Sequence, residues 1–223
     1  MLARLERQHN AKMMRDADLE QAASEYYNPE LPYHNFGHAL SAALTGLKIA
    51  QECRDENIPI DDSIVYCALL FHDAGYHQDH EKLGFESKEA LSAKIARDIL
   101  EKKSYPDGFI DNVEKAILCT TREASCTTTE ENAVRAADLS GLAAEFSVFR
   151  RNTELLKQEF EILYSQKIEW EQWIERATTI IGGYLRQELR LTQFYSGQPG
   201  QSPFHQKIKQ NLFQLNAEVL PPK

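Results

Sequence analysis

Apolar residues recur at spacings of three and four along most of the chain. Over residues 36–53 they form a stripe that small residues widen on both sides, a pattern typical of a largely buried helix. The same spacing predicts further helices in five places: after Ser87, after Pro106, over 146–163, over 170–189 and over 204–218. Only Gly182 and Gly183 interrupt the helix over 170–189. Because no segment alternates for long with a period of two, the pattern predicts an all-α protein.

Residues 64–71 form the most apolar segment of the chain, since none of them carries a charge or an amide. Such a run fits either a buried strand or a central helix. The neighbouring helical segments favour a helix, and Asp61 and Asp62 supply caps for its start. His72 and Asp73 follow the run directly.

The length of the chain and its breaks predict one domain over residues 1–223, a compact bundle of eight or nine helices without internal repeats. The sequence YSGQPGQSP at 195–203 is typical of a turn-rich linker. We therefore expect residues 195–223 to form a linker and a C-terminal helix rather than a second domain.

The composition excludes several classes of protein. With 42% hydrophobic and 26% charged residues, the chain has enough apolar material for a core, which rules out disorder throughout. The longest apolar run is far shorter than the roughly 20 residues of a membrane-spanning helix, so we expect no membrane segment. A net charge of −9 without a cluster of Lys and Arg argues against a large nucleic-acid surface.

Two further features predict a cytoplasmic location. Residues 1–16 mix charged and apolar side chains and contain no apolar stretch typical of an export signal. The cysteines at positions 53, 67, 119 and 126 form no Cys-x-x-Cys pair, and Cys67 lies in the apolar run, where a reduced thiol packs as a small apolar side chain. We therefore expect a reducing, cytoplasmic setting.

Five of the seven histidines fall between positions 34 and 80. His34 and His38 are four residues apart, a spacing that would place both on one face of a helix, about 6 Å apart along its axis. Alternatively, Asn35 caps the helix, which leaves His34 in the preceding loop and His38 in the first turn. A third interpretation is a pair of half-exposed histidines without a function.

His72 and Asp73 end the most apolar segment, and Asp138 is surrounded by apolar residues in RAADLSGL. Burying such side chains costs several kcal/mol unless they are paired or bind a metal. A purely structural explanation is open as well. In that case His72 is hydrogen-bonded to Asp73 at a helix end, and Asp138 is the last residue of a helix.

One metal site would account for all of these residues. The imidazoles of His38 and His72 and the carboxylates of Asp73 and Asp138 make a mixed nitrogen and oxygen set that suits Mn, Fe, Mg, Co, Ni or Zn. Helical proteins build such sites from side chains on facing helices. We therefore predict a divalent metal ion bound by these four side chains.

The order of these motifs resembles the HD superfamily of metal-dependent phosphohydrolases. Three elements carry the resemblance: YHNFGH at 33–38, FHDAGY at 71–76 and ADLS at 137–140. YHNxxH and ADLS are similar to elements of cyclic-nucleotide phosphodiesterase catalytic domains, and FHDAGY followed by Glu86 and Ser87 resembles small bacterial predicted HD hydrolases. The resemblance spans residues 20 to about 190 and implies an HD-type helical fold.

The resemblance also implies a role for individual residues. The metal ligands correspond to His38, His72, Asp73 and Asp138. His34 corresponds to the proton donor or to a residue beside the ligands. Glu86 matches an acid near the metal in the small hydrolases, although a helix N-terminal charge explains it equally well.

Four more polar residues are left without a role: His77, His80, Lys82 and Arg122. The two histidines lie in a polar loop, where solvated histidines are common, and the two cations are candidates for contact with a phosphate. Residues 119–132 contain no histidine, although related hydrolases often carry further ligands in this segment. We therefore expect one tightly held ion and at most a weak second one.

The resemblance implies hydrolysis of a phosphomonoester or phosphodiester of a nucleotide, or of a related small metabolite, by a metal-activated water. Asp73 would orient the water and accept its proton, and His34 would protonate the leaving oxygen. Two other functions are open: a di-iron oxygenase, which needs more histidine ligands, and a non-catalytic ligand-binding or signalling module that keeps the fold. The sequence leaves the substrate, the metal and the oligomeric state open.

Overall fold

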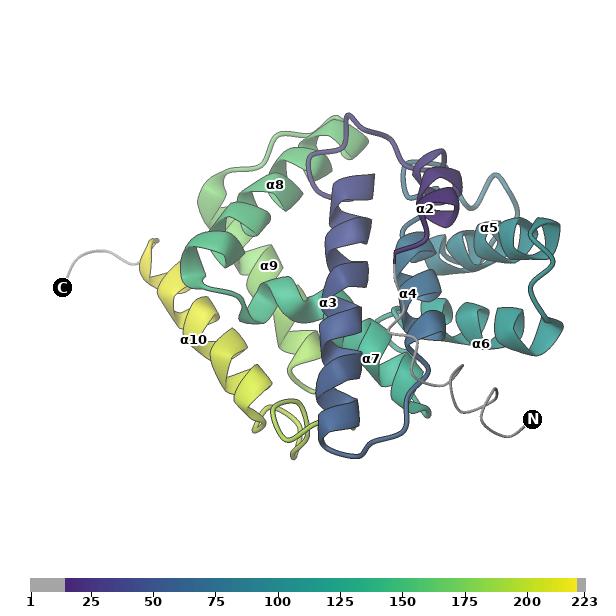
Figure 1. Cartoon of the computed structure of the whole chain (residues 1–223). Helices are drawn as coiled ribbons and strands as arrows, with labels where there is room; N and C mark the ends of the chain where they lie inside the picture. Colours follow the sequence, from purple (N-terminus) through teal and green to yellow (C-terminus); the bar gives the residue numbers. More distant parts are fainter. Residues whose placement is uncertain (1–14, 220–223) are drawn as a thin grey trace.

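Nine α-helices and one short 3₁₀ helix make up residues 15–219, the part of the chain that the computed structural model describes, and this part contains no strand (Figure 1). In chain order they are α2 (Ala17–Ser24), α3 (Phe36–Asp55), α4 (Asp62–Phe71), α5 (Lys88–Lys102), α6 (Asp107–Leu118), α7 (Thr129–Asp138), η1 (Leu139–Ala143), α8 (Phe146–Tyr164), α9 (Trp170–Tyr184) and α10 (Pro203–Ala217). The predicted all-α class is confirmed.

Helix α4 lies at the centre of the first part of the fold. All residues from position 64 to 71 are buried, as expected for a segment without a polar face. Helices α3, α5, α6 and α7 all contact it. The apolar run is therefore a central helix and not a strand, and its C-terminal end lies inside the bundle.

Side-chain caps set where several helices begin. Asn35 caps α3, Asp61 caps α4 and Ser87 caps α5, each by accepting a hydrogen bond from a backbone N–H of the first turn. At the start of α7, Thr128 and Glu131 form a capping box. These caps fix the first turns of the helices that surround the candidate site.

Helices α8, α9 and α10 form the other side of the bundle. In the view of Figure 1 they lie across α3 from α5 and α6. The 3₁₀ helix η1 leads from α7 into α8 and packs against α10. The predicted C-terminal helix is present, and it buries Phe204, Ile208, Leu212 and Leu215. The assignment of residues 1–223 to one domain stays a prediction.

One predicted helix is shorter in the structure. We expected a helix over 170–189, whereas α9 ends at Tyr184, directly after Gly182 and Gly183. Glycine weakens a helix because it loses more backbone freedom on folding than any other residue. Leu189 is still buried, but it packs from the loop that follows α9.

The cysteines differ from the expectation of reduced thiols. Cys119, the residue after α6, forms a disulfide with Cys126, and their Cα atoms are 5.8 Å apart. The turn after α6 brings the two side chains together, although they form no Cys-x-x-Cys pair. Cys53 and Cys67 are free and buried. Because of this disulfide, the cysteines no longer support a reducing setting. The cytoplasmic location stays a prediction.

The segments considered for membrane insertion and export are only partly described. Among helices α2 to α10, none combines the length and the apolar character needed to cross a bilayer. The predicted lack of an export signal rests on residues 1–16, of which 1–14 lie outside the described residues.

Gly46 allows the close approach of α3 and α4. A Cβ atom added there would lie 2.4 Å from Leu69 Cδ1 and 2.8 Å from Val65 Cγ1, and both of these side chains are fully buried. We predict that Gly46→Ala lowers the free energy of unfolding by about 1–3 kcal/mol, the usual cost of overpacking, although alanine favours a helix. Urea unfolding followed by circular dichroism measures the change.

Gly182 in α9 is the matched control, because a Cβ atom added there meets no atom within 4 Å. Gly182→Ala should raise the free energy of unfolding by up to about 1 kcal/mol, since alanine restricts the unfolded chain and favours the helix. A stabilising Gly46→Ala would contradict the tight contact between α3 and α4.

Candidate metal centre

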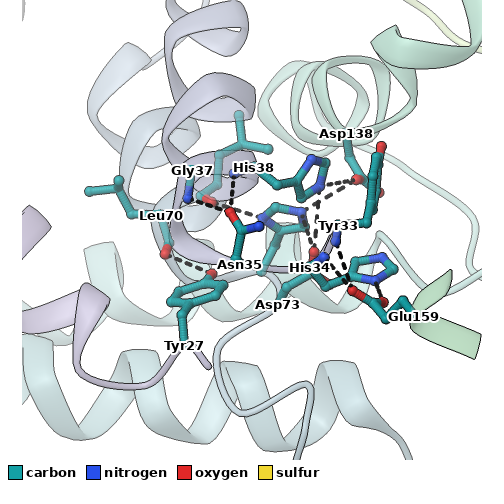
Figure 2. Close-up of polar contacts among 12 residues, drawn as sticks. Tyr27, Tyr33, His34, Asn35, Gly37, His38, Leu70, Asp73, Asp138 and Glu159 are labelled. Carbon is teal, nitrogen blue, oxygen red and sulfur yellow. Dashed lines mark hydrogen bonds and ion pairs between the residues drawn. The ribbon is translucent and has the colours of Figure 1, made fainter. Parts of the chain in front are cut away.

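His38 lies in the first turn of α3 because Asn35 caps this helix. The Asn35 side chain accepts hydrogen bonds from Gly37 N at 2.9 Å and from His38 N at 3.3 Å. Its amide group donates to Leu31 O at 2.9 Å, which holds the preceding loop. Of the alternatives for the two histidines, the second is therefore confirmed: His34 precedes the helix and His38 belongs to it (Figure 2).

His72, Asp73 and Asp138 come from the ends of two helices that contact each other. His72 directly follows α4, and Asp138 is the last residue of α7. His72 Nδ1 donates to Leu69 O at 2.8 Å, so its Nε2 faces the two carboxylates. A histidine held in this way presents one fixed nitrogen as a ligand.

The four predicted ligands converge. His72 Nε2 lies 3.0 Å from Asp73 Oδ2 and 3.3 Å from Asp138 Oδ1. His38 Nε2 lies 3.5 Å from the same Asp73 oxygen and 3.6 Å from the same Asp138 oxygen. In Figure 2, His38, Asp73 and Asp138 point toward one another from separate elements.

The atoms at this point lack the partners that buried polar groups normally have. His38 Nε2, His72 Nε2 and Asp73 Oδ2 are buried without a hydrogen-bond partner, a state that costs roughly 1–3 kcal/mol for each group. His38, His72 and Asp138 can each offer one donor atom within 4.8 Å of the other two. Asp73 reaches both imidazoles. This donor set fits a divalent ion.

The four groups also set one another's charge. Burial by itself would lower the pKa of His72, but the facing carboxylates outweigh it and raise that pKa well above its ordinary value. Burial would raise the pKa of Asp73, yet the neighbouring imidazoles, His72 foremost, hold it at about 2. Against burial, the facing imidazoles of His38 and His72 also lower the pKa of Asp138. Both carboxylates are therefore ionised at neutral pH and attract a cation.

His34 is held by a residue that the sequence analysis missed. Glu159 in α8 accepts hydrogen bonds from Tyr33 N at 3.0 Å and His34 N at 2.8 Å, and its other oxygen pairs with His34 Nδ1 (Figure 2). The Glu159 side chain is only 2% exposed. Burial would raise the pKa of Glu159, but the contacts with His34 lower it, so this carboxylate is ionised.

The sequence contains a weak signal for Glu159. It lies between Leu156 and Leu163 on one face of α8. An acid among apolar residues needs a partner, which is the argument that made Asp138 a candidate. Helix α8 contains other acids, however, and spacing does not tell which one is buried. Glu154 and Glu161 pair with basic side chains of the same helix.

Tyr76 and Lys88 extend the site from His34. The Tyr76 ring stacks on the His34 ring, with centroids 3.8 Å apart and planes inclined by 17°. Lys88 Nζ, from the first residue of α5, lies 3.5 Å from the centroid of the Tyr76 ring. Burial lowers the pKa of Lys88, against the effect of nearby carboxylates. A half-buried basic side chain therefore stands beside the site.

The converging ligands open on a cavity of about 350 Å³. Asp73, Asp138 and His34 lie at one end of this cavity, and side chains of α8 and α9 line most of the remaining surface. A second cavity of about 360 Å³ reaches His38 and Asp138. The site is therefore accessible to a small molecule.

The other predicted residues lie apart from the ligands. Glu86 is exposed and lines neither cavity, whereas Glu89, in the first turn of α5, lines the first one. The catalytic role of Glu86 stays a prediction. Four more residues line neither cavity and are not part of the metal cluster: His77, His80, Lys82 and Arg122.

A comparison with protein families agrees with this geometry. A family model described as HD domain matches residues 35–140, a range that contains all four converging ligands. Residues 35–140, just under half of the chain, therefore match the HD domain, as the order of the motifs predicted. No curated protein matches the chain. The finer resemblances, to small bacterial hydrolases and to cyclic-nucleotide phosphodiesterases, stay predictions.

We predict that the purified protein binds a divalent metal ion and that His72→Ala loses it, because the substitution removes the fixed nitrogen donor that lies beside both carboxylates. Elemental analysis after reconstitution measures the metal content. Removal of the ion with a chelator should lower the melting temperature of the wild-type protein, since a ligand of the folded state stabilises it.

His77→Ala is the control, because this exposed histidine lies outside the cluster. It should keep both the metal content and the response to the chelator. If His72→Ala holds as much metal as the wild-type protein, the ion does not bind at the converging side chains.

Proposed function

We propose that the protein hydrolyses a phosphomonoester or phosphodiester of a nucleotide, or of a related small metabolite, with a divalent metal ion. The observation that carries the proposal is the position of His34. Buried Glu159 holds this protonatable side chain at the end of the cavity where the metal ligands converge. Hydrolysis of a phosphate ester needs both a site that offsets the charge of the phosphoryl oxygens and a proton donor for the leaving oxygen.

Each side chain of the site then has a distinct task. A bound divalent ion would offset phosphoryl charge and lower the pKa of a water. Asp73, ionised and facing the cavity, would accept the proton of the attacking water. His34 would donate a proton to the leaving oxygen while Glu159 and the stacked Tyr76 ring keep its orientation.

The protein carries a net charge of −9, so an anionic substrate needs local positive charge. Besides the ion, Lys88 supports the proposal. Its ammonium group lies against the Tyr76 ring and forms no salt bridge with an acid of the described residues. Lys88 is therefore available to a phosphate that approaches Asp73 and His34.

A screen of nucleotides, cyclic nucleotides and sugar phosphates with Mn, Mg, Co, Ni or Zn tests the proposal. We expect metal-dependent hydrolysis of at least one compound, and Asp73→Ala should abolish it because both a ligand and the proton acceptor are lost. Binding of one of these compounds without hydrolysis under any metal would instead favour a non-catalytic module.

His34 and His38 should separate chemistry from metal binding. We predict that His34→Asn keeps the metal content and lowers kcat by roughly 10²- to 10⁴-fold, the range for a positioned proton donor. The defect should shrink for nitrophenyl esters, whose leaving group needs little protonation. His38→Asn should lose both metal and activity. Loss of metal from His34→Asn would make His34 a ligand, and full activity would exclude it as the proton donor.

Glu159→Gln tests whether the buried carboxylate positions His34. The substitution keeps the size of the side chain and removes its charge, so we predict unchanged metal content and a roughly 10- to 100-fold lower kcat, as for other residues that orient a functional group. This defect should also shrink for nitrophenyl esters. An equal loss for all substrates would indicate a role of Glu159 in stability instead.

A further inference from the structure

The first cavity, of about 350 Å³, has two chemically different ends. Next to α3, α4 and α7, its lining includes carboxylates of the metal cluster and Glu89. At the other end, α8 and α9 supply apolar and aromatic side chains, among them Leu156, Phe160, Leu163, Trp173 and Ile180. A molecule that fills the cavity therefore has one polar and one apolar end.

Two of the polar groups at the apolar end are already hydrogen-bonded within the protein. Trp173 Nε1 donates to Thr153 O at 2.9 Å, and Thr153 Oγ1 donates to Phe149 O at 2.9 Å. These two donors are not free for a ligand. Arg176 of α9 also lines the cavity and lies over the Phe160 ring, 4.6 Å from its centroid, so this end combines apolar contact with one guanidinium stacked on an aromatic ring.

Aromatic rings form a continuous wall at this end. The Phe160 ring centroid lies 5.6 Å from that of Trp173 and 4.9 Å from that of Tyr164, distances typical of interacting aromatic pairs. Phe160, Leu163 and Ile180 are half-buried, so part of their surface is free for contact. Flat, polarisable surfaces of this kind favour a planar ring over a flexible polar chain.

We infer that the substrate is a phosphate ester whose organic group contains a planar aromatic ring, and that the apolar end of the cavity between α8 and α9 binds this ring. The inference rests on the proposed hydrolysis, since a phosphate at the converging ligands leaves this end of the cavity for the rest of the molecule. A sugar phosphate without an aromatic ring would leave the aromatic side chains of this end exposed to water.

Kinetics with two probe esters test the preference for a ring. With metal-loaded protein, KM for 1-naphthyl phosphate should be roughly 10- to 100-fold lower than KM for ribose 5-phosphate, the gain expected from burying the apolar surface of a ring. KM is compared because the aryl ester also has the better leaving group, which raises kcat. Equal values for the two esters would overturn the inference.

A substitution that fills the cavity locates the ring. Ile180→Trp places a large side chain at the apolar end, and kcat/KM for 1-naphthyl phosphate should fall at least about 10-fold while that for ribose 5-phosphate is unchanged. Thr179→Trp puts the same side chain on the neighbouring exposed position of α9, outside the cavity, and should change neither value. Equal effects of both substitutions would contradict the assignment.

A second pair of variants tests the same end of the cavity in case Ile180→Trp does not fold. Leu163→Ala removes apolar contact from the cavity wall and should raise KM for 1-naphthyl phosphate by roughly 3- to 10-fold. Ile162→Ala, at a position of the same helix that is 56% exposed and outside the cavity, should leave KM unchanged.

Calorimetry with 1-naphthol, which carries no phosphate, separates the ring site from catalysis. Binding to the wild-type protein that Ile180→Trp weakens at least about 10-fold, and Thr179→Trp does not, supports the ring site even when no ester is hydrolysed, in which case the proposed function alone fails. Hydrolysis of phosphate esters without binding of 1-naphthol and without a preference for 1-naphthyl phosphate keeps the function and overturns the ring site.

Discussion

Two imidazoles and two carboxylates meet where α3 begins and where α4 and α7 end. Because these groups are largely buried, their charges must be offset within the site for the folded state to be stable. His38 Nε2, His72 Nε2 and Asp73 Oδ2 have no hydrogen-bond partner, so in isolation they weaken the folded state. A cation shared by these atoms would give each of them a partner and so stabilise the folded state. The distances between these atoms depend on how closely α3 and α7 pack against α4, and Gly46 permits that approach. The packing of the core therefore sets the geometry of the candidate metal centre.

The parts of the structure that follow from local pattern could be predicted from the sequence. The apolar run over 64–71 forms a central helix because it has no polar face, and Asn35 caps α3 because its side chain suits a helix start. The four ligands could be found because polar residues that interrupt apolar segments need partners, and the order of their motifs matches the HD domain. All of these signals act over one helix or one turn.

The parts that depend on contacts between distant segments could not be predicted. Glu159 contacts His34, which is 125 residues earlier in the sequence, and no spacing within α8 distinguishes it from Glu154 and Glu161, which pair with basic side chains. The disulfide of Cys119 with Cys126 depends on the path of one turn. The aromatic wall of the cavity arises only when α8 and α9 pack together beside the ligands. Each of these features is set by tertiary packing, which sequence periodicity does not encode.

The pairing of His34 with Glu159 links two stretches of sequence that otherwise contribute separate parts of the site. The four candidate metal ligands all lie within 35–140, whereas most of the cavity wall comes from α8 and α9, after that range ends. Substitutions in α8 and α9 can therefore change the shape of the cavity without removing a candidate metal ligand. The condition is that Glu159 stays where it contacts His34. A relative that shares only the motifs of 35–140 would therefore keep the candidate metal ligands, while its cavity wall would depend on its own counterparts of α8 and α9.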